Sequence, residues 1–531
     1  MKKRTFLMIL LAGLVTQTFA QFTPVWQQIT DYYTASDVGR GVEVFKNPIT
    51  EETTVYSVVI SGVDTNTNII LISRDANGNQ LWQIALSLED YKFYHISNLY
   101  IDEEENVIII GYARYIPTNA DRSFLYKVNN EGSLLWQQTY DGSDIEGFDF
   151  DDTGEYYYFA SQYGNVYKVQ SDNGEIVWVK PNYSTTIFDL IFSEGAIYVT
   201  GELEVDPIGA ELITRKFNES GTIVWTNIYD LPDSLPAYPF GIGFSLAVDN
   251  NGRILVGGRS SYHNIVLLAY SPDGIRKTIL DRRVGWQDVY DVQVFPTDNG
   301  DIYLTGNYIN YSAGDFENYV LFTVKIDSNR NVVWADKINH RIFKKAIFIT
   351  EQNMLWILSE RWDGMDNGLD EIIILNGYTG DGAKVKKNCN VFYGNPSSPY
   401  SFGYDPEADF ATADGISFYL QGDRIYPDPL EKDELIVRYD FNDPELKLMS
   451  AEQNSNTNIY PNPFKDILYL NTGNDIINCT VFNLQGTAIF SLYNVSGKIE
   501  IQTENWPSGV YYIQQYINGT YQTDAVVKID K

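Results

Sequence analysis

Carboxylates are the residues of this 531-residue sequence that could most readily do chemistry. Two dense groups occur, Asp102-Glu103-Glu104-Glu105 and Asp149-Phe150-Asp151-Asp152. Calcium prefers oxygen ligands of this kind, although neither group has the spacing of an EF-hand loop. Asp149, Asp151 and Asp152 are therefore the metal candidates, and calcium is the one cofactor left open. The alternative is an ordinary acidic turn in front of a strand.

Patterns for nucleophilic, zinc or nucleotide chemistry are absent from the sequence. The three histidines, His95, His263 and His340, lie far apart, and no zinc-ligand spacing occurs. Gly243-Phe244-Ser245-Leu246-Ala247 has the spacing of a nucleophile elbow, but it stands in a strand repeat without a strand-to-helix turn. No phosphate loop or dinucleotide fingerprint is present. We therefore predict no catalytic residue, and a protein that is not an enzyme is the favoured interpretation.

The charge of the chain limits its partners. The formal net charge of −32 repels nucleic acid and anionic lipid, so a nucleic-acid partner is not expected. Such a charge is typical of a soluble surface, and capture of calcium or of cationic partners is the sharper alternative. Two cysteines, Cys389 and Cys479, fall in different predicted domains, so no disulfide framework is expected.

The first twenty residues have the pattern of a secretory signal peptide. A basic start, Lys2–Arg4, precedes the apolar run Phe6–Val15, and Thr18–Ala20 supplies a small residue before Gln21. The apolar run is too short for a stable transmembrane helix, and no other stretch is apolar and long enough. Residues 1–20 are thus predicted to direct export, and the mature chain is predicted to contain no transmembrane segment.

A pattern of short strands and tight turns recurs through residues 21–449. In each copy a strand-like segment ends in a small residue, an apolar partner segment follows, and an Asn/Asp/Gly turn leads to a third segment. The first of these segments occur at Val55–Gly62, Val107–Gly111, Tyr156–Ala160, Ile197–Gly201, Ile254–Gly258, Ile302–Gly306, Leu355–Ser359 and Phe418–Gly422. Six third segments carry a tryptophan: Trp26, Trp82, Trp136, Trp178, Trp225 and Trp334. We expect these tryptophans to lie on outermost strands and to pack between blades, rather than to stack on a ligand.

A repeat of roughly 40 to 50 residues that contains only strands and turns predicts a β-propeller. Eight copies predict eight blades, with seven as the alternative because residues 389–410 are irregular. The segment around Trp26 has no copy of the first segment before it. We therefore expect this N-terminal strand to complete the last blade and so to cover a sheet edge.

The blade pattern resembles the quinoprotein-like and related secreted propeller families, with Ser171–Trp178 as the closest copy of their Asp/Asn-x-x-Gly-x-φ-φ-Trp signature. This resemblance implies a propeller scaffold. It does not imply a quinone cofactor, because the quinone dehydrogenases of that superfamily use a vicinal cysteine pair and this chain has no adjacent cysteines. No cofactor is predicted, and calcium is the one that the sequence leaves open.

A polar linker at residues 450–458 precedes a second β-rich region at residues 459–531, which alone predicts a small β-sandwich. Tyr-Pro-Asn-Pro-Phe at its start, Gly486 after a strand, Ser-Gly-Val-Tyr and a basic end together resemble a type IX secretion C-terminal (type A) sorting domain. The residues that match are Tyr460, Pro461, Asn462, Pro463, Phe464, Gly486, Gly509, Tyr511, Lys528 and Lys531. The family usually ends Lys-φ-φ-Lys, whereas Asp530 stands in the third place here.

The resemblance implies passage through the outer membrane by the type IX secretion machinery, and a secreted or cell-surface location. The sequence leaves three functions open: a scaffold that binds a glycan or a protein, a carboxylate-dependent glycosidase or lyase, and a structural part of an adhesin. An Asp/Glu/Tyr/Arg cluster at one mouth of the propeller would favour the enzyme. Two long loops, Asp230–Phe240 and Asn388–Phe410, are candidate recognition surfaces.

Overall fold

The computed structural model divides the chain into two compact units, Met1–Asp443 and Pro444–Lys531. The predicted signal peptide, both candidate loops apart from their strand ends, and linker residues 450–457 lie outside the described residues. The structure describes residues 25–30, 37–63, 66–162, 164–181, 185–205, 209–229, 241–261, 264–283, 289–310, 318–339, 341–349, 354–361, 373–379, 384–388, 409–412, 417–425, 432–440, 458–460, 464–471, 477–483, 488–507, 509–517 and 520–528.

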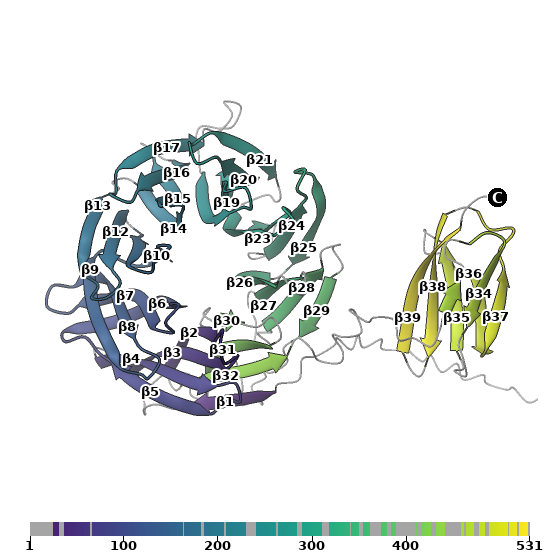
Figure 1. The fold of residues 1–531 in the computed structure, drawn as a ribbon, viewed down its shortest axis with the longest axis horizontal. Helices are drawn as coiled ribbons and strands as arrows, with labels where there is room; N and C mark the ends of the chain where they lie inside the picture. The colour runs from purple at the N-terminus through teal and green to yellow at the C-terminus, as the bar shows by residue number, and fades with distance from the viewer. Residues whose placement is uncertain are drawn as a thin grey trace, which may run out of the picture. The chain divides into compact units, whose positions relative to one another are not determined.

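The described strands of the first unit form eight four-stranded antiparallel sheets arranged as a ring (Figure 1). From the innermost strand outwards, blades 1 to 4 contain β2 (Asp37–Lys46), β3 (Thr53–Val63), β4 (Asn66–Asp75), β5 (Gln80–Leu86); β6 (Tyr91–Ile101), β7 (Val107–Tyr115), β8 (Ala120–Val128), β9 (Leu134–Asp141); β10 (Ile145–Phe150), β11 (Tyr156–Ser161), β12 (Asn165–Gln170), β13 (Ile176–Pro181); β14 (Thr185–Ser193), β15 (Ala196–Glu204), β16 (Ala210–Asn218) and β17 (Ile223–Tyr229).

Blades 5 to 8 follow the same order around the ring. They contain β18 (Ile242–Val248), β19 (Ile254–Ser261), β20 (Asn264–Tyr270), β21 (Arg276–Arg283); β22 (Val289–Pro296), β23 (Ile302–Asn310), β24 (Asn318–Ile326), β25 (Val332–Asn339); β26 (Arg341–Ile349), β27 (Met354–Arg361), β28 (Ile373–Thr379), β29 (Lys384–Asn388); β30 (Asp409–Ala411), β31 (Ser417–Ile425), β32 (Lys432–Asp440) and β1 (Trp26–Thr30). The predicted all-β propeller is confirmed, and each copy of the repeat supplies the second strand of one sheet.

Blade 8 closes the ring with strands from both ends of the propeller region. β1 pairs with β32 from Trp26↔Arg438 to Thr30↔Glu434, which confirms the predicted closure. Between blades 8 and 1, Arg74 Nη2 lies 2.8 Å from Glu434 Oε2, and both side chains are almost fully buried. Arg74 also donates to Ser57 Oγ at 2.6 Å, and Gln421 Nε2 donates to Glu434 Oε1 at 2.9 Å. The closing seam is thus held by a buried charged network as well as by the strand ladder.

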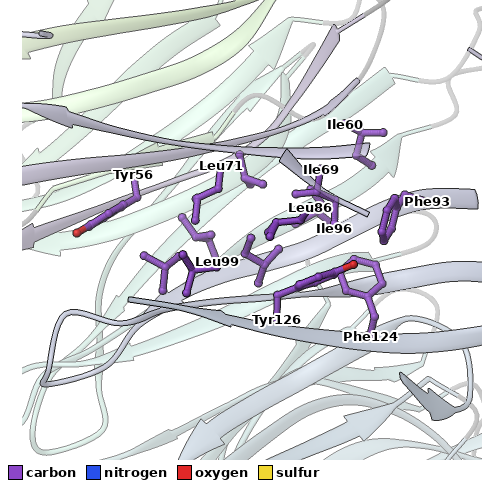
Figure 2. Close-up of a cluster of buried hydrophobic side chains, with 14 of the residues drawn as sticks. Tyr56, Ile60, Ile69, Leu71, Leu86, Phe93, Ile96, Leu99, Phe124 and Tyr126 are labelled. Carbon is purple, nitrogen blue, oxygen red and sulfur yellow. The ribbon is translucent and has the colours of Figure 1, made fainter. Parts of the chain in front are cut away.

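The core of the ring consists of apolar layers between neighbouring blades. Between blades 1 and 2, Leu71 and Ile69 of β4 pack with Leu99, Phe93 and Tyr126, as Figure 2 shows. A four-stranded sheet cannot bury both of its faces alone, so each blade must pack against two neighbours. This requirement explains why the inner strands carry near-continuous apolar runs such as Val107–Ile110, all of which are buried.

Within the described residues, seven of the eight innermost strands contain a β-bulge where they pair with their neighbour. The register shifts between Gly39 and Gly41, Ile96 and Asn98, Ile145 and Gly147, Ile187 and Asp189, Gly243 and Ser245, Tyr290 and Gln293, and Phe343 and Lys345. β6 has a second shift between Phe93 and His95. A bulge inserts an unpaired residue and re-aims its side chain, so these positions set what the inner strands present.

The tryptophans form a repeated contact with the following blade. Each lies on an outermost strand. In five of the six, all but Trp334, the indole N–H donates to a turn carbonyl of the next blade, for example Trp82 to Asn130 at 2.7 Å and Trp136 to Ser171 at 3.0 Å. The indole ring also covers the turn glycine of the next blade. A Cβ added to Gly132, which has a φ of +82°, would lie 2.8 Å from the Trp82 ring. The same contact joins Trp26 to Gly78, Trp136 to Gly174, Trp178 to Gly221 and Trp225 to Gly274. Only glycine allows this turn conformation and this close approach together.

The seam between blades 5 and 6 lacks this Trp–Gly contact at both of its positions. Thr278 stands on β21 where six of the other copies have tryptophan, four residues after the turn glycine Gly274. In the facing turn of blade 6, Arg330 replaces the glycine and keeps a positive φ of 74°. A cavity of about 90 Å³ lies between the same two blades, lined by residues that include Leu280 and Phe322. This volume is well below that of a ligand pocket, about 300 Å³ or more.

We predict that Thr278→Trp together with Arg330→Gly stabilises the ring by about 1–3 kcal/mol. Glycine relieves the positive φ of Arg330, and the new indole can then cover the turn. Thr278→Trp alone should give no gain, because the Arg330 side chain leaves no close approach. Urea unfolding of the four variants of this double-mutant cycle measures the coupling. If the effects of the two single substitutions on the free energy of unfolding simply add, the predicted contact between positions 278 and 330 is contradicted.

The second unit contains two antiparallel sheets. One has the order β33 (Asn458–Tyr460), β34 (Ile467–Asn471), β37 (Lys498–Gln502), and the other β36 (Ala488–Val495), β35 (Ile477–Asn483), β38 (Gly509–Ile517), β39 (Thr520–Lys528). Leu468 and Ile501 from the first sheet share one buried cluster with Val481, Ile513 and Val526 from the second. The predicted small C-terminal β-sandwich is confirmed. Among the described residues of the whole chain, no helix is long and apolar enough to cross a membrane.

Candidate functional site

The strongest gathering of chemically capable side chains lies where blades 2 and 3 meet, on the face of the ring at which the innermost strands begin. β6 begins at Tyr91, which pairs with Tyr115 at the end of β7. The connection from β9 to β10 returns to this same face and carries Asp144. We call the group the blade 2–3 cluster; it comprises Tyr94, His95, Ser97, Tyr112, Arg114, Asp144 and Glu146.

Asp144 is the centre of the cluster. His95 Nδ1 lies 2.8 Å from Asp144 Oδ2, Ser97 Oγ donates to Asp144 Oδ1, and the Ile145 N–H donates to Oδ1 at 3.0 Å. The side chains of His95 and Asp144 are 33% and 21% exposed, so the pair is reachable from solvent. A carboxylate bound to Nδ1 fixes the orientation of an imidazole ring. Ser97 bonds Asp144 rather than His95, so the three residues do not form a nucleophilic triad.

Glu146 is the bulged residue of β10, between Ile145 and Gly147. Burial raises the pKa of its carboxyl to about 7, the charge of Asp144 adds to the rise, and His95 opposes it. Asp291, on the innermost strand of blade 6, also raises this pKa. Since blades 3 and 6 are not neighbours, this interaction acts across the axis of the ring (Figure 1). Glu146 is thus a carboxyl group that can donate a hydrogen bond near neutral pH.

An aromatic and basic rim borders these polar groups. Tyr94 is the second bulged residue of β6, is 36% exposed, and stacks on Tyr112 with centroids 5.8 Å apart and an interplanar angle of 6°. The Arg114 guanidinium and the Lys92 ammonium lie 4.9 and 5.0 Å from the Tyr94 ring centroid. Arg114 Nε also donates to Asp121 at 2.8 Å. Burial raises the pKa of Tyr112, with the charge of Asp144 as the next cause, so this phenol is not an activated nucleophile.

The proposed calcium ligands have other partners in the structure. Asp149, on β10, accepts the N–H of Phe150 at 2.8 Å and the N–H of Phe192 in blade 4 at 2.7 Å. Asp151 accepts the N–H of Tyr156 at 3.0 Å and the hydroxyl of Thr153 at 2.7 Å, within the β10–β11 turn that also holds Asp152. Within the described residues, no three His, Cys, Asp or Glu side chains are placed to hold a metal ion. Asp149 acts as a bridge between blades.

The second acidic group also makes structural contacts. Asp102 Oδ2 lies 3.0 Å from Lys127 Nζ, and Glu105 accepts the hydroxyl of Tyr56 at 2.9 Å. Ser245, in the sequence that has nucleophile-elbow spacing, lies on strand β18 and not at a strand-to-helix turn. These residues therefore add nothing to the blade 2–3 cluster.

Asp189 repeats the bridging role of Asp149 one blade further on. It accepts the N–H of Leu190 at 2.8 Å and the N–H of Leu246 in blade 5 at 2.7 Å. Burial raises the pKa of Asp189 from 3.8 to about 7, and the charge of Asp149 contributes to the rise. The equivalent residue of blade 2 is Asn98. Its side chain is uncharged, and its Oδ1 accepts the N–H of Leu99.

We predict that Asp189 makes the propeller less stable as pH rises from about 4 to 7. In that window the folded state retains the proton and the unfolded state has lost it, so each pH unit costs up to about 1.4 kcal/mol. Asp189→Asn should flatten this slope, measured by urea unfolding between pH 4.5 and 8. Asp273→Asn is the control, because a hydrogen bond from Ser271 lowers the pKa of exposed Asp273 and moves its titration below the window. Parallel curves for wild type and Asp189→Asn would refute the prediction.

Two of the sorting-motif residues that the structure describes, Phe464 and Tyr511, lie in the core of the C-terminal sandwich. Phe464 and Tyr511 are buried and pack against the partly buried Trp506. Lys528 Nζ lies 5.7 Å from the Phe464 ring centroid and donates to the Lys465 carbonyl. The backbone of Gly509 pairs with that of Lys528, and Tyr460 pairs with Tyr469. Pro461, Asn462, Pro463, Gly486 and Lys531 lie outside the described residues. Of the two cysteines, Cys479 is buried and free.

Residues 458–528 match the model of the secretion system C-terminal sorting domain family. Together with the ring of sheets, this match defines the class: an exported β-propeller protein with a C-terminal sorting domain. The export route is type IX secretion, which confirms the predicted sorting domain, the secretion machinery as a partner, and a secreted or cell-surface location. No characterised protein is significantly similar to the chain in sequence.

Solved structures with related geometry include two WD40 domains and one BamB. The C-terminal WD40 domain of Sif2 has 8% identity and a TM-score of 0.49, with 79% of this chain and 99% of that chain covered. BamB from Moraxella catarrhalis has 13% identity and a TM-score of 0.35 over 66% and 99%. The WD40 domain of coronin from Toxoplasma gondii has 9% identity and a TM-score of 0.40 over 66% and 89%. Because these identities and TM-scores are low, the propeller fold is assigned from the sheet topology of this structure and not from these similarities.

The sequence did not indicate Asp144, Glu146 or Tyr94 as site residues. One signal was available: His95 and Asp144 are 49 residues apart, which is one repeat. Residues one repeat apart in a propeller occupy neighbouring blades at the same level. Polar residues at the starts of consecutive inner strands could therefore have been compared copy by copy.

Proposed function

We propose that the propeller is an exported binding module whose recognition surface is the blade 2–3 cluster, and whose ligand is a glycan or a protein. One observation supports this most: a part-exposed histidine–carboxylate pair, a carboxyl group with a pKa near 7 and a stacked tyrosine pair converge on one face. Convergent polar groups beside aromatic surface, with a perturbed pKa, are typical of binding sites. A rigid ring of sheets holds such groups in fixed positions.

The test compares the exported full-length protein with His95→Ala/Arg114→Ala on arrays of glycans and of extracellular proteins, with and without calcium. We expect saturable binding that the double variant weakens more than about tenfold, a loss of at least about 1.4 kcal/mol. Val177→Ala, at an exposed position on outermost strand β13, is the matched control and should bind as wild type. Loss of binding in chelator would assign a role to the acidic turns.

A carboxylate-dependent glycosidase or lyase is the second candidate, because the cluster contains the Asp, Glu, Tyr and Arg residues that such chemistry uses. Glu146 has the raised pKa of a general acid, and Asp144 is a second carboxylate held by three donors. The same incubations, assayed for new reducing ends or unsaturated sugars, decide between the two. Product release abolished by Glu146→Gln would replace the binding module by the enzyme. Self-association without any ligand would favour the adhesin component instead.

A further inference from the structure

We infer that the seam between blades 5 and 6 is a second interaction site, which binds an extended acidic peptide segment by one aliphatic side chain and the carboxylates beside it. The site is separate from the blade 2–3 cluster, and the inference does not rest on the function proposed for that cluster. We call it the blade 5–6 groove. Its two walls carry Lys277, Leu280, Arg282, Val332, Ala335 and Lys337.

Strand pairing fixes which side chains of β21 face blade 6. Three residues of the neighbouring strand β20 belong to the buried cluster that blades 5 and 6 share: Ile265, Leu267 and Ala269. Their partners on β21 are Arg282, Leu280 and Lys277, respectively. Directly paired residues of antiparallel strands have their side chains on the same face of the sheet. These three side chains of β21 therefore face blade 6.

The opposite wall is β25, the outermost strand of blade 6 (Figure 1). Lys337 and Ala335 pair with Phe322 and Val324 of β24, which belong to the same buried cluster. By the same argument, Lys337 and Ala335 face blade 5. The groove thus has Lys277 and Arg282 on one wall and Lys337 on the other.

An apolar slot lies between the two walls. The cavity of about 90 Å³ is lined by the buried side chains of Ile265, Phe322 and Val324 and by Leu280 and Ala335. An apolar cavity of about 150 Å³ takes benzene, so this one suits an aliphatic group of about four carbon atoms. A sugar has no group as apolar as this, and the acyl chain of a long fatty acid is several times larger. The side chain of a leucine or an isoleucine matches the slot in both size and polarity.

The groove is positively charged, although the chain has a net charge of −32. Lys277, Arg282 and Lys337 are all exposed. Lys337 Nζ lies 4.9 Å from the ring centroid of Tyr308. Within the described part of the chain, neither Lys277 nor Arg282 has a hydrogen-bond or ion-pair partner. These cations can therefore bind carboxylates of a ligand without first losing a partner.

The acidic residues on the described parts of β21 and β25 bond to other blades. Asp281 accepts the hydroxyl of Tyr229 in blade 4 at 2.8 Å. Asp336 accepts the hydroxyl of Tyr378 in blade 7, also at 2.8 Å. The local charges of the groove thus favour an acidic ligand over a neutral or a basic one.

The end of the groove at the β24–β25 turn adds another positive group. Arg330 stands two residues before Val332, and its charge interacts with Arg253 and Asp249 of blade 5, so it lies in the same seam. Asp249 already forms an ion pair with Arg253. Nη1 of Arg330 is buried and has no hydrogen-bond acceptor among the described residues. A buried donor without an acceptor is costly, and a carboxylate or carbonyl of a bound peptide would supply one.

The experiment measures fluorescence anisotropy of labelled, end-blocked peptides with the full-length exported protein. The peptides place one leucine between glutamates at several spacings. The salt concentration is about 0.15 M, at which repulsion from carboxylates farther than about 8 Å is screened. We expect saturable binding that weakens about tenfold when alanine replaces the leucine, and at least about tenfold when glutamine replaces the glutamates.

Variants of the protein locate this binding. Lys277→Ala/Arg282→Ala should weaken it at least about tenfold, and the variant should fold because both side chains are exposed. Ala335→Leu fills the slot and should weaken it about tenfold. Lys46→Ala, at the exposed end of β2, is the matched control for a lost positive charge and should bind as wild type. Lys277→Glu/Arg282→Glu should instead bind peptides in which lysine replaces glutamate.

Three results would overturn the inference. The first is that no peptide of the array binds saturably. The second is peptide binding that Lys277→Ala/Arg282→Ala and Ala335→Leu both leave unchanged. The third is that an acidic polysaccharide or a long-chain fatty acid, and no peptide, binds with a loss in Lys277→Ala/Arg282→Ala. None of these results bears on the blade 2–3 cluster, whose test uses other ligands and other variants.

Discussion

Glu434→Gln should lower the free energy of unfolding of the propeller by about 3–5 kcal/mol. The substitution leaves the Arg74 guanidinium, which is 2% exposed, without the carboxylate that lies 2.8 Å away. A buried charge that loses its counter-ion is no longer compensated for most of its desolvation cost, and Gln421 has no charge with which to replace Glu434. The effect falls on the seam between blades 8 and 1, where β1 closes the ring. Urea unfolding of the exported protein, monitored by tryptophan fluorescence, measures it.

Two control variants test whether the loss comes from breaking a buried ion pair. Arg74→Met with Glu434→Leu removes both partners and should recover most of the loss, since apolar side chains of similar size replace a buried ion pair at little cost. Arg122→Ala removes a pair whose side chains are 33% and 81% exposed and should cost less than about 1 kcal/mol. Equal losses for Glu434→Gln and Arg122→Ala would contradict the argument.

Trp136→Ala should cost about 3–5 kcal/mol, the typical loss for a buried large aromatic residue. Trp136 is 8% exposed, packs between blades 2 and 3, and covers the turn glycine Gly174, where a Cβ would lie 2.7 Å from the ring. Its indole N–H donates to the Ser171 carbonyl at 3.0 Å. Removal opens a cavity and takes from the Ser171 carbonyl one of its two donors, since Lys127 Nζ also donates to it at 3.2 Å. Chemical unfolding gives the magnitude, and hydrogen exchange should place the loss in blades 2 and 3.

Trp136→Phe is the matched variant for this contact. It retains most of the ring and loses the N–H donor, so we expect a smaller cost of about 1–2 kcal/mol. The chain already has two outermost strands without tryptophan, β21 and β29, so Trp136→Ala should still fold. A loss below about 1 kcal/mol in Trp136→Ala would show that the Trp–Gly contact is incidental to stability.

The sequence by itself determined the export route and the architecture. Signals for both are local or periodic: a sorting motif whose Phe464 and Tyr511 belong to one small core, and a repeat of strand segments and Asn/Asp/Gly turns. Turn residues act through their own backbone, as the Asp75 carboxylate does when it accepts the N–H groups of Asn77 and Asn79. Such features can be predicted from short stretches of sequence, because the interactions that produce them act between residues only a few positions apart.

Tertiary structure alone decided which carboxylates belong to the candidate site. Asp149 and its acidic neighbours have the composition of a calcium site in the sequence. In the structure, the carboxylate oxygens of Asp149 accept backbone N–H groups from two blades. Glu146 is inconspicuous in the sequence, and its raised pKa comes from burial and from Asp144 and Asp291, of which Asp291 lies on another blade. Arg74 and Glu434 are 360 residues apart and meet only because the ring closes. Desolvation and long-range pairing are properties of the assembled ring, so no local pattern of residues can encode them.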